Sequence, residues 1–280
     1  MKIKKFKLND GTYFRYKKIG KGKPILLLHT FRNRLEYSDK LGELLKSKNT
    51  VYLIDLPGFG DSPINSKTIY DLNFFTNSII EFIKNLKINN LRIAGESIGA
   101  VLSASVALRL PKQVKKIFMF NPYDYDSYFG EGIRRGNFFA NFILFNISLP
   151  ILGEIFSSLE NKFILRNVMG GGFINLENLS DDYLNLLCTS LKKKGYVYHF
   201  RNVLQKFKKA DEIKEIYKRT KVPVKLVYGI NDWANESERL QTQKLLKLDK
   251  YHVIDNCKHF SFLENSKDVF VILNSWILYL

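Results

Sequence analysis

Hydrophobic and polar positions follow two strand-like patterns along this chain. Residues 3–8 and 13–19 alternate between apolar and charged side chains on either side of Asn9-Asp10-Gly11. Asp-Gly tolerates the positive φ of a tight turn, so this segment predicts a β-hairpin. Short continuous apolar runs bounded by turn residues are typical of strands buried in a parallel sheet. Such runs cover residues 25–28, 51–54, 91–94, 114–120, 224–228 and 251–254.

Helical spacing of apolar residues appears between several of these runs. It covers residues 72–86, 98–110 and about 262–280. Strands that alternate with helices predict an α/β fold with a mostly parallel wound sheet, here preceded by the N-terminal hairpin.

The alternation of strand and helix stops after Pro122, and we expect a helical cap over residues 123–217. The core then comprises residues 1–122 and 218–280. Within the cap, residues 138–156 are nearly free of charge but contain Pro150 and several polar residues, which argues against a membrane span. We expect this stretch to combine a buried helix with an apolar flap over a pocket. Gly170-Gly171-Gly172 predicts a flexible hinge or cap loop.

Composition narrows the classes of protein. The net charge is +17, from 44 Lys and Arg against 27 Asp and Glu, but the lysines are scattered. This scatter predicts no specific nucleic-acid partner, and it leaves membrane-surface association open without favouring it. Only Cys188 and Cys257 are present, and the N-terminus lacks the pattern of a signal peptide, so we expect a cytoplasmic protein. The oligomeric state stays open.

The strongest motif is Gly95-Glu96-Ser97-Ile98-Gly99, a G-x-S-x-G pentapeptide between a predicted strand and a predicted helix. The flanking glycines permit a sharp turn that exposes the Ser97 hydroxyl as a nucleophile. A glycine-rich turn with an incidental serine is the alternative.

A nucleophilic serine needs a base and an acid. His259 lies after the last predicted strand, at the carboxyl edge of the sheet, whereas the other three histidines have plausible structural roles. Asp232 follows the penultimate strand, where its carboxylate could hold the imidazole; an Asx-turn is the alternative.

These motifs, together with residues 20–29 and 55–62, resemble the α/β-hydrolase superfamily, in particular its capped serine esterase, lipase and C–C hydrolase branch. The resemblance implies an oxyanion hole formed by the backbone N–H groups of Phe31 and Ile98. Thr30 stands where the family usually has glycine. Asp124 is a reserve for the acid, because some relatives draw it from the preceding strand.

The resemblance implies a serine hydrolase that cleaves a small or medium acyl ester through an acyl-enzyme on Ser97, with no cofactor and no metal. Asp55 and Asp61 bracket a turn, but two carboxylates are too few for a metal site. An acyltransferase, a C–C bond hydrolase and a catalytically silent relative remain alternatives. The expected partner is a small-molecule acyl substrate of apolar character. The candidate residues that contact it are His29, Tyr123, Phe142, Trp233 and Phe260. For Phe142, a place in the cap's own core is an equally open alternative.

Overall fold

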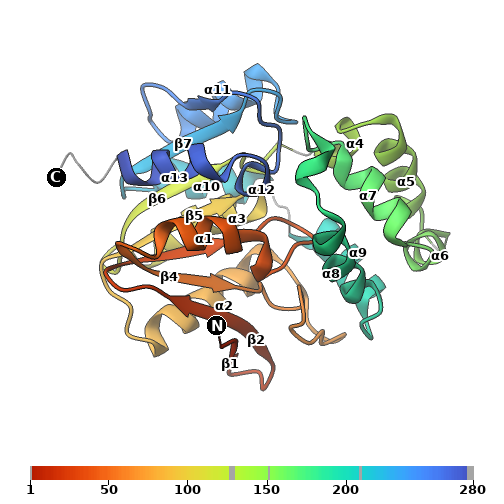
Figure 1. Ribbon diagram of the computed structural model, residues 1–280, viewed down its shortest axis with the longest axis horizontal. Helices are drawn as coiled ribbons and strands as arrows, with labels where there is room; N and C mark the ends of the chain where they lie inside the picture. Colours follow the sequence, from red (N-terminus) through yellow and green to blue (C-terminus); the bar gives the residue numbers. More distant parts are fainter. Residues whose placement is uncertain (1, 126–129, 151, 208–209, 276–280) are drawn as a thin grey trace.

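A computed structural model of the chain describes residues 2–125, 130–150, 152–207 and 210–275. Its centre is an eight-stranded sheet with the order β1-β2-β4-β3-β5-β6-β7-β8 (Figure 1). The strands are β1 (Lys4–Lys7), β2 (Tyr13–Ile19), β3 (Lys23–Leu28), β4 (Asn49–Ile54), β5 (Leu91–Glu96), β6 (Val114–Phe120), β7 (Val224–Gly229) and β8 (His252–Ile254).

The sheet is antiparallel only at its N-terminal edge. β1 pairs with β2 and β2 pairs with β4 in antiparallel register, whereas all later pairs are parallel. This arrangement confirms the predicted hairpin and the mostly parallel sheet. β3 and β4 start earlier than their apolar runs, because Lys23 pairs with Asn49 before the strands enter the core.

Helices cover both faces of the sheet, and the alternation of side chains along β3 shows why. Leu26 and Leu28 pack into one hydrophobic cluster with α2 (Leu72–Asn85) and α3 (Ile98–Arg109), while Ile25 and Leu27 pack into the other. The second face carries η1 (Leu35–Ser38), α1 (Asp39–Leu45), α12 (Ser261–Glu264) and α13 (Ser266–Ser275). The helix predicted over 262–280 is thus divided near Asn265, and its last five residues lie outside the described part.

The cap helices form a group at one side of the sheet (Figure 1). They are α4 (Glu131–Arg135), α5 (Phe138–Ser148), α6 (Leu152–Ser158), α7 (Lys162–Gly170), η2 (Leu176–Asn178), α8 (Asp181–Leu191) and α9 (Tyr196–Lys206). The next helix, α10 (Ala210–Arg219), packs instead against α3 and α11 (Glu236–Leu245). Although 217 was the expected end of the cap, α10 therefore lies with the core helices.

The apolar stretch 138–156 does not form one buried helix. It forms α5 and α6, and several of its large side chains face outward: Phe138 is 86% exposed, and Phe142, Phe145, Leu152 and Ile155 are each about half exposed. Only one side of α5 is buried, through Ala140, Leu144 and Ile147. Within the residues that the structure describes, no helix has the length and apolar character needed to cross a bilayer.

Candidate active site

Ser97 lies on the tight turn between β5 and α3. Its backbone angles, φ 58° and ψ −120°, are strained for a residue with a side chain. The two flanking glycines are required by close contacts: a Cβ on Gly95 would lie 2.0 Å from the Gly99 carbonyl oxygen, and one on Gly99 would lie 2.5 Å from the Leu28 carbonyl oxygen. The pentapeptide thus lets the helix approach the strand closely enough to present the serine.

His259 and Asp232 are joined directly. His259 Nδ1 lies 2.5 Å from Asp232 Oδ1, and both side chains are almost completely buried. The second oxygen of Asp232 accepts a hydrogen bond from the Ala234 N–H at 3.1 Å. Because a carboxylate only accepts, Nδ1 carries the proton and Nε2 is left with its lone pair. Nε2 has no hydrogen-bond partner among the described residues.

Aromatic and backbone contacts hold the imidazole in place. Trp233 stacks on the His259 ring with 3.8 Å between centroids. The backbone N–H of His259 donates to the Gly172 carbonyl at 3.0 Å, and Trp233 Nε1 donates to the Gly171 carbonyl at 3.2 Å. A Cβ on Gly172 would lie 2.4 Å from the Phe260 ring. Gly171 and Gly172, expected to form a flexible hinge or cap loop, therefore allow the cap to pack tightly on the loop that carries His259.

A polar network that the sequence analysis missed lies next to Ser97 and His259. The Glu96 carboxyl accepts hydrogen bonds from the Ser261 N–H at 2.7 Å and from the hydroxyls of Ser261 and Tyr37. Burial raises the pKa of Glu96 to about 8. Asn121 Nδ2 donates to the His259 carbonyl at 3.0 Å, and Asn121 Oδ1 accepts from the Gly229 N–H at 2.7 Å. The sequence offered one signal for this network, which is that the acidic residue Glu96 stands at the end of an apolar strand.

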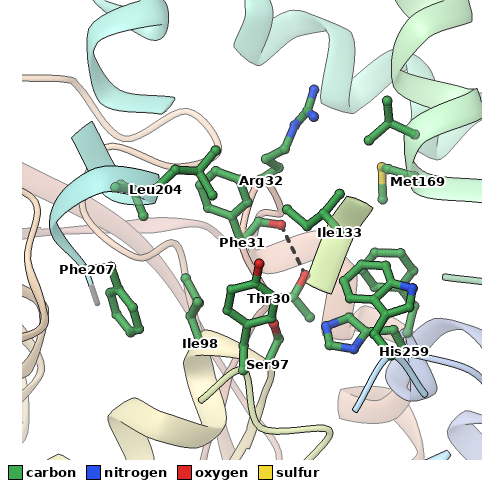
Figure 2. Close-up of a pocket in the computed structure, with 15 residues that line it drawn as sticks. Thr30, Phe31, Arg32, Ser97, Ile98, Ile133, Met169, Leu204, Phe207 and His259 are labelled. Carbon is green, nitrogen blue, oxygen red and sulfur yellow. Dashed lines mark hydrogen bonds between the residues drawn. The ribbon is translucent and has the colours of Figure 1, made fainter. Parts of the chain in front are cut away.

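Ser97 and His259 both line a cavity beneath the cap (Figure 2). Of the predicted contacts, Phe31, Ile98, Tyr123, Trp233 and Phe260 also line it. The remaining lining residues had no local sequence signal, and most are apolar residues of the cap: Thr30, Arg32, Ile133, Val168, Met169, Val203, Leu204 and Phe207.

Two predicted substrate contacts lie elsewhere. His29 is fully buried, and its Nε2 accepts a hydrogen bond from the Leu56 N–H at 2.9 Å. Burial lowers the pKa of His29 to about 4, so this histidine is a neutral structural residue. Phe142 is 53% exposed on α5 and does not line the cavity. A helical pattern alone could not tell which side of α5 faces inward.

Phe31 and Ile98, whose backbone N–H groups are the expected oxyanion donors, line the same cavity as Ser97. Within the described part of the chain, no hydrogen bond engages the backbone N–H of Phe31 or of Ile98. Arg32, which follows Phe31, has a φ of 63°.

The reserve acid is engaged elsewhere. Asp124 accepts a hydrogen bond from Thr242 Oγ1 at 2.9 Å, and burial raises its pKa to about 7. Asp55 binds Arg15 Nε at 2.7 Å and accepts the Leu35 N–H at 2.8 Å. Asp55, one of the two carboxylates considered as metal ligands, is thus paired with an arginine.

Comparisons with known proteins agree with this architecture. Residues 23–266 match the family profile described as alpha/beta hydrolase fold. Cfl2 from Burkholderia cenocepacia has the same fold, with a TM-score of 0.82 and 16% identity over 98% of this chain and 95% of that one.

Curated relatives match more locally. The pimeloyl-[acyl-carrier protein] methyl ester esterase of Aeromonas hydrophila is 25% identical over 36% of this chain and 38% of its own length. The 1-acylglycerol-3-phosphate O-acyltransferase ABHD5 of Rattus norvegicus is 30% identical over 36% of this chain and 30% of its own length. The chain spans less than half the length of the curated relatives it matches. The family profile, in contrast, covers most of the chain, and on that basis the protein belongs to the alpha/beta hydrolase fold family.

Proposed function

We propose that the protein is a serine hydrolase that cleaves a carboxylic ester, with Ser97 as nucleophile, His259 as general base and Asp232 as the orienting acid. One observation carries the proposal. The 2.5 Å contact of His259 Nδ1 with Asp232 leaves Nε2 unpartnered among the described residues, in the cavity that the strained Ser97 also lines.

The chemistry follows from the two ring nitrogens. His259 Nε2 takes the hydroxyl proton as Ser97 Oγ attacks the ester carbonyl, and the oxyanion accepts hydrogen bonds from the N–H groups of Phe31 and Ile98. Collapse of the tetrahedral intermediate expels the alcohol, which takes the proton from Nε2. Water then attacks the acyl-enzyme with Nε2 again as base, and the acid and free Ser97 are released.

The cavity favours an apolar acyl group. Its walls beyond Ser97 and His259 are mainly aliphatic and aromatic. No step of the proposed reaction calls for a cofactor or a metal.

Acyl transfer is the second candidate, because one relative is named as an O-acyltransferase. The same acyl-enzyme would then be attacked by an alcohol in place of water. Adding an alcohol acceptor during turnover separates the two reactions: an acyltransferase forms the new ester, and a hydrolase releases mainly free acid.

Labelling with a fluorophosphonate probe tests the proposal, alongside hydrolysis of short and medium p-nitrophenyl esters. Wild-type protein should be labelled and should release p-nitrophenol, while Ser97→Ala should lose both. Ser158→Ala, which changes an exposed cap serine, is the control and should behave like wild type. Folded wild-type protein that neither labels nor turns over would favour a catalytically silent relative.

A further inference from the structure

The loop that carries Phe31 is held from outside, by the cap. This loop, residues 29–34, will be called the oxyanion loop. Its side chains at positions 32, 33 and 34 each bind a different cap residue. The Arg32 guanidinium forms an ion pair with Glu160, which also accepts a hydrogen bond from the Tyr196 hydroxyl at 2.7 Å.

The next two contacts come from α8. The Tyr183 hydroxyl donates to Asn33 Oδ1 at 2.6 Å. Arg34 Nη1 donates to the Leu186 carbonyl at 2.7 Å and to Thr189 Oγ1 at 3.0 Å. Three successive residues of one core loop are therefore bound to two separate parts of the cap.

The contact between Arg32 and Glu160 is protected from water. The Arg32 side chain is 6% exposed and that of Glu160 only 2%. Arg32 also lies over the Phe200 ring of α9, 4.8 Å from its centroid, and its side chain extends away from Ser97 toward the cap (Figure 2). A buried ion pair of this kind fixes geometry, because separating it would leave an unpaired charge in the interior.

The oxyanion loop contains one backbone conformation that its own contacts do not account for. Arg32 is a non-glycine residue in the left-handed region, with a φ of 63°, a conformation that persists only where surrounding contacts enforce it. Within the loop, the Asn33 N–H donates to the Thr30 carbonyl at a long 3.3 Å, and the Asn33 side chain donates to the Thr30 hydroxyl and, at 3.2 Å, to the Phe31 carbonyl. The Thr30 hydroxyl also donates to the Phe31 carbonyl at 3.2 Å, and His29 Nδ1 lies 2.7 Å from the Thr30 carbonyl oxygen. Asn33 is the residue that Tyr183 holds.

We propose that Glu160 and Tyr183 are positioning residues for the oxyanion hole: the cap must be seated on Arg32 and Asn33 for the Phe31 N–H to point at the developing oxyanion. The inference rests on the proposed function. It makes the cap part of transition-state stabilisation, so that a substrate reacts at full rate only with the cap in this position.

A second cap–core contact supplies a matched control. Lys193, between α8 and α9, donates through Nζ to the carbonyls of Gly58 at 2.7 Å and Gly60 at 2.9 Å, and also to that of Ser62. It joins the same two layers but binds the turn after β4 and not the oxyanion loop. Lys193→Met therefore removes one cap–core contact while the contacts that hold Arg32 and Asn33 stay in place.

The experiment compares Tyr183→Phe, Glu160→Gln and Lys193→Met with wild type, using a p-nitrophenyl ester and a trifluoromethyl ketone, whose adduct with Ser97 places an oxyanion in the hole. Tyr183→Phe and Glu160→Gln should each lower kcat about tenfold or more, with little change in KM. This loss approaches the 10²- to 10³-fold effect of removing one oxyanion-hole donor. Their affinity for the ketone should fall in parallel. Lys193→Met should retain kcat and ketone affinity within about threefold.

Three results would decide otherwise. Unchanged kcat and ketone affinity in Tyr183→Phe, or losses equal to those of Lys193→Met, would overturn the positioning role while wild-type turnover left the hydrolase intact. Wild-type protein without turnover or labelling would overturn the proposed function, and this inference with it. Thermal unfolding of each variant checks the fold, and Tyr183→Phe, which keeps the aromatic ring, decides if Glu160→Gln does not fold.

Discussion

Ser97 adopts backbone angles that few residues tolerate, and buried polar neighbours hold the loops around it. Glu96 binds Ser261, two residues after His259, while Asn121 binds the histidine loop and the end of β7. The turn at Ser97, the end of β7 and the loop that carries His259 are thus joined by buried hydrogen bonds. Buried polar groups of this kind keep one arrangement because an unsatisfied partner would be costly.

The assignment of the acid can be tested at single residues. Asp232→Asn should lower kcat about 10³- to 10⁴-fold, because an amide at this position favours the wrong imidazole tautomer. Asp124→Asn should retain most activity, since Asp124 binds Thr242 and not His259. Ester hydrolysis by the two folded variants is the measurement; the reverse ranking would make Asp124 the acid.

Glu96 should make stability depend on pH. Its pKa is raised by burial from 4.5 to about 8, so between these values the folded protein holds a proton that the unfolded chain has released. The free energy of unfolding should therefore fall as pH rises from about 4.5 to 8, and this contribution should level off above about pH 8.

Urea unfolding across pH 4–9 checks this dependence. The slope should be smaller in Glu96→Gln, which has no proton to lose. Asp211→Asn, a change at a fully exposed side chain, should keep the wild-type slope. An unchanged slope in Glu96→Gln would mean that Glu96 is already ionised in the folded protein.

At the scale of elements, α5 shows an apolar helix with only one buried side. Leu144 is completely buried, whereas Phe142, two positions earlier, is 53% exposed. Since residues two apart on a helix point in different directions, their energetic roles should differ. The apolar residues of stretch 138–156 thus include exposed side chains as well as buried ones.

A pair of alanine variants tests the orientation of α5. Leu144→Ala should destabilise the protein by about 2–5 kcal/mol through the lost burial and the cavity left behind. Phe142→Ala should change stability by no more than about 0.5 kcal/mol, as is usual at exposed positions. Denaturant midpoints measure both; equal losses would mean that the outer face of α5 is covered in solution.

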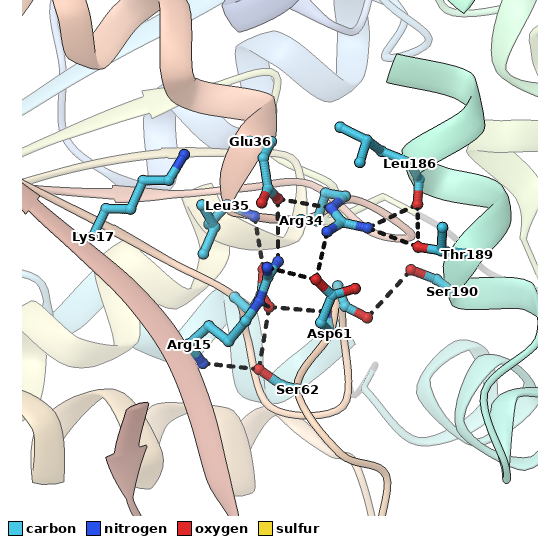
Figure 3. Close-up of polar contacts among 12 residues, drawn as sticks. Arg15, Lys17, Arg34, Leu35, Glu36, Asp61, Ser62, Leu186, Thr189 and Ser190 are labelled. Carbon is cyan, nitrogen blue, oxygen red and sulfur yellow. Dashed lines mark hydrogen bonds and ion pairs between the residues drawn. The ribbon is translucent and has the colours of Figure 1, made fainter. Parts of the chain in front are cut away.

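At the scale of the whole molecule, charged side chains join the core to the cap. Arg15 on β2 binds the buried Asp55, and Arg34 reaches from Asp61 to α8 (Figure 3). The turn after β4, which resembles the family in sequence, thus serves as an anchoring point for charges and for cap contacts.

Removing one partner of the Arg15–Asp55 pair should be costly. Arg15→Met leaves a buried carboxylate without its cation and should lower the free energy of unfolding by about 3–5 kcal/mol. Lys218→Met, which breaks an exposed pair with Glu215, should cost less than about 1 kcal/mol. Chemical denaturation gives both values, and a small loss in Arg15→Met would show that the remaining donors to Asp55 suffice.

Local patterns in the sequence determined the strands, the hairpin and the order of serine, acid and histidine. Alternating apolar residues, short apolar runs and Asp-Gly turns are patterns within short segments, so they can be read from the sequence directly. The assignments of catalytic roles to Ser97, Asp232 and His259 remain a prediction, now supported by the contact between Asp232 and His259.

Tertiary structure alone decided which side chains meet across the fold. His29 and Phe142 were expected at the substrate but lie in the core and on the surface, because burial depends on neighbours that are distant in sequence. The same reason hid the contacts of Glu96, Asn121, Glu160 and Tyr183, whose partners named above lie between 36 and 165 positions away. Periodicity predicts that a helix or strand has an apolar face, but only the packing of the layers determines what that face contacts.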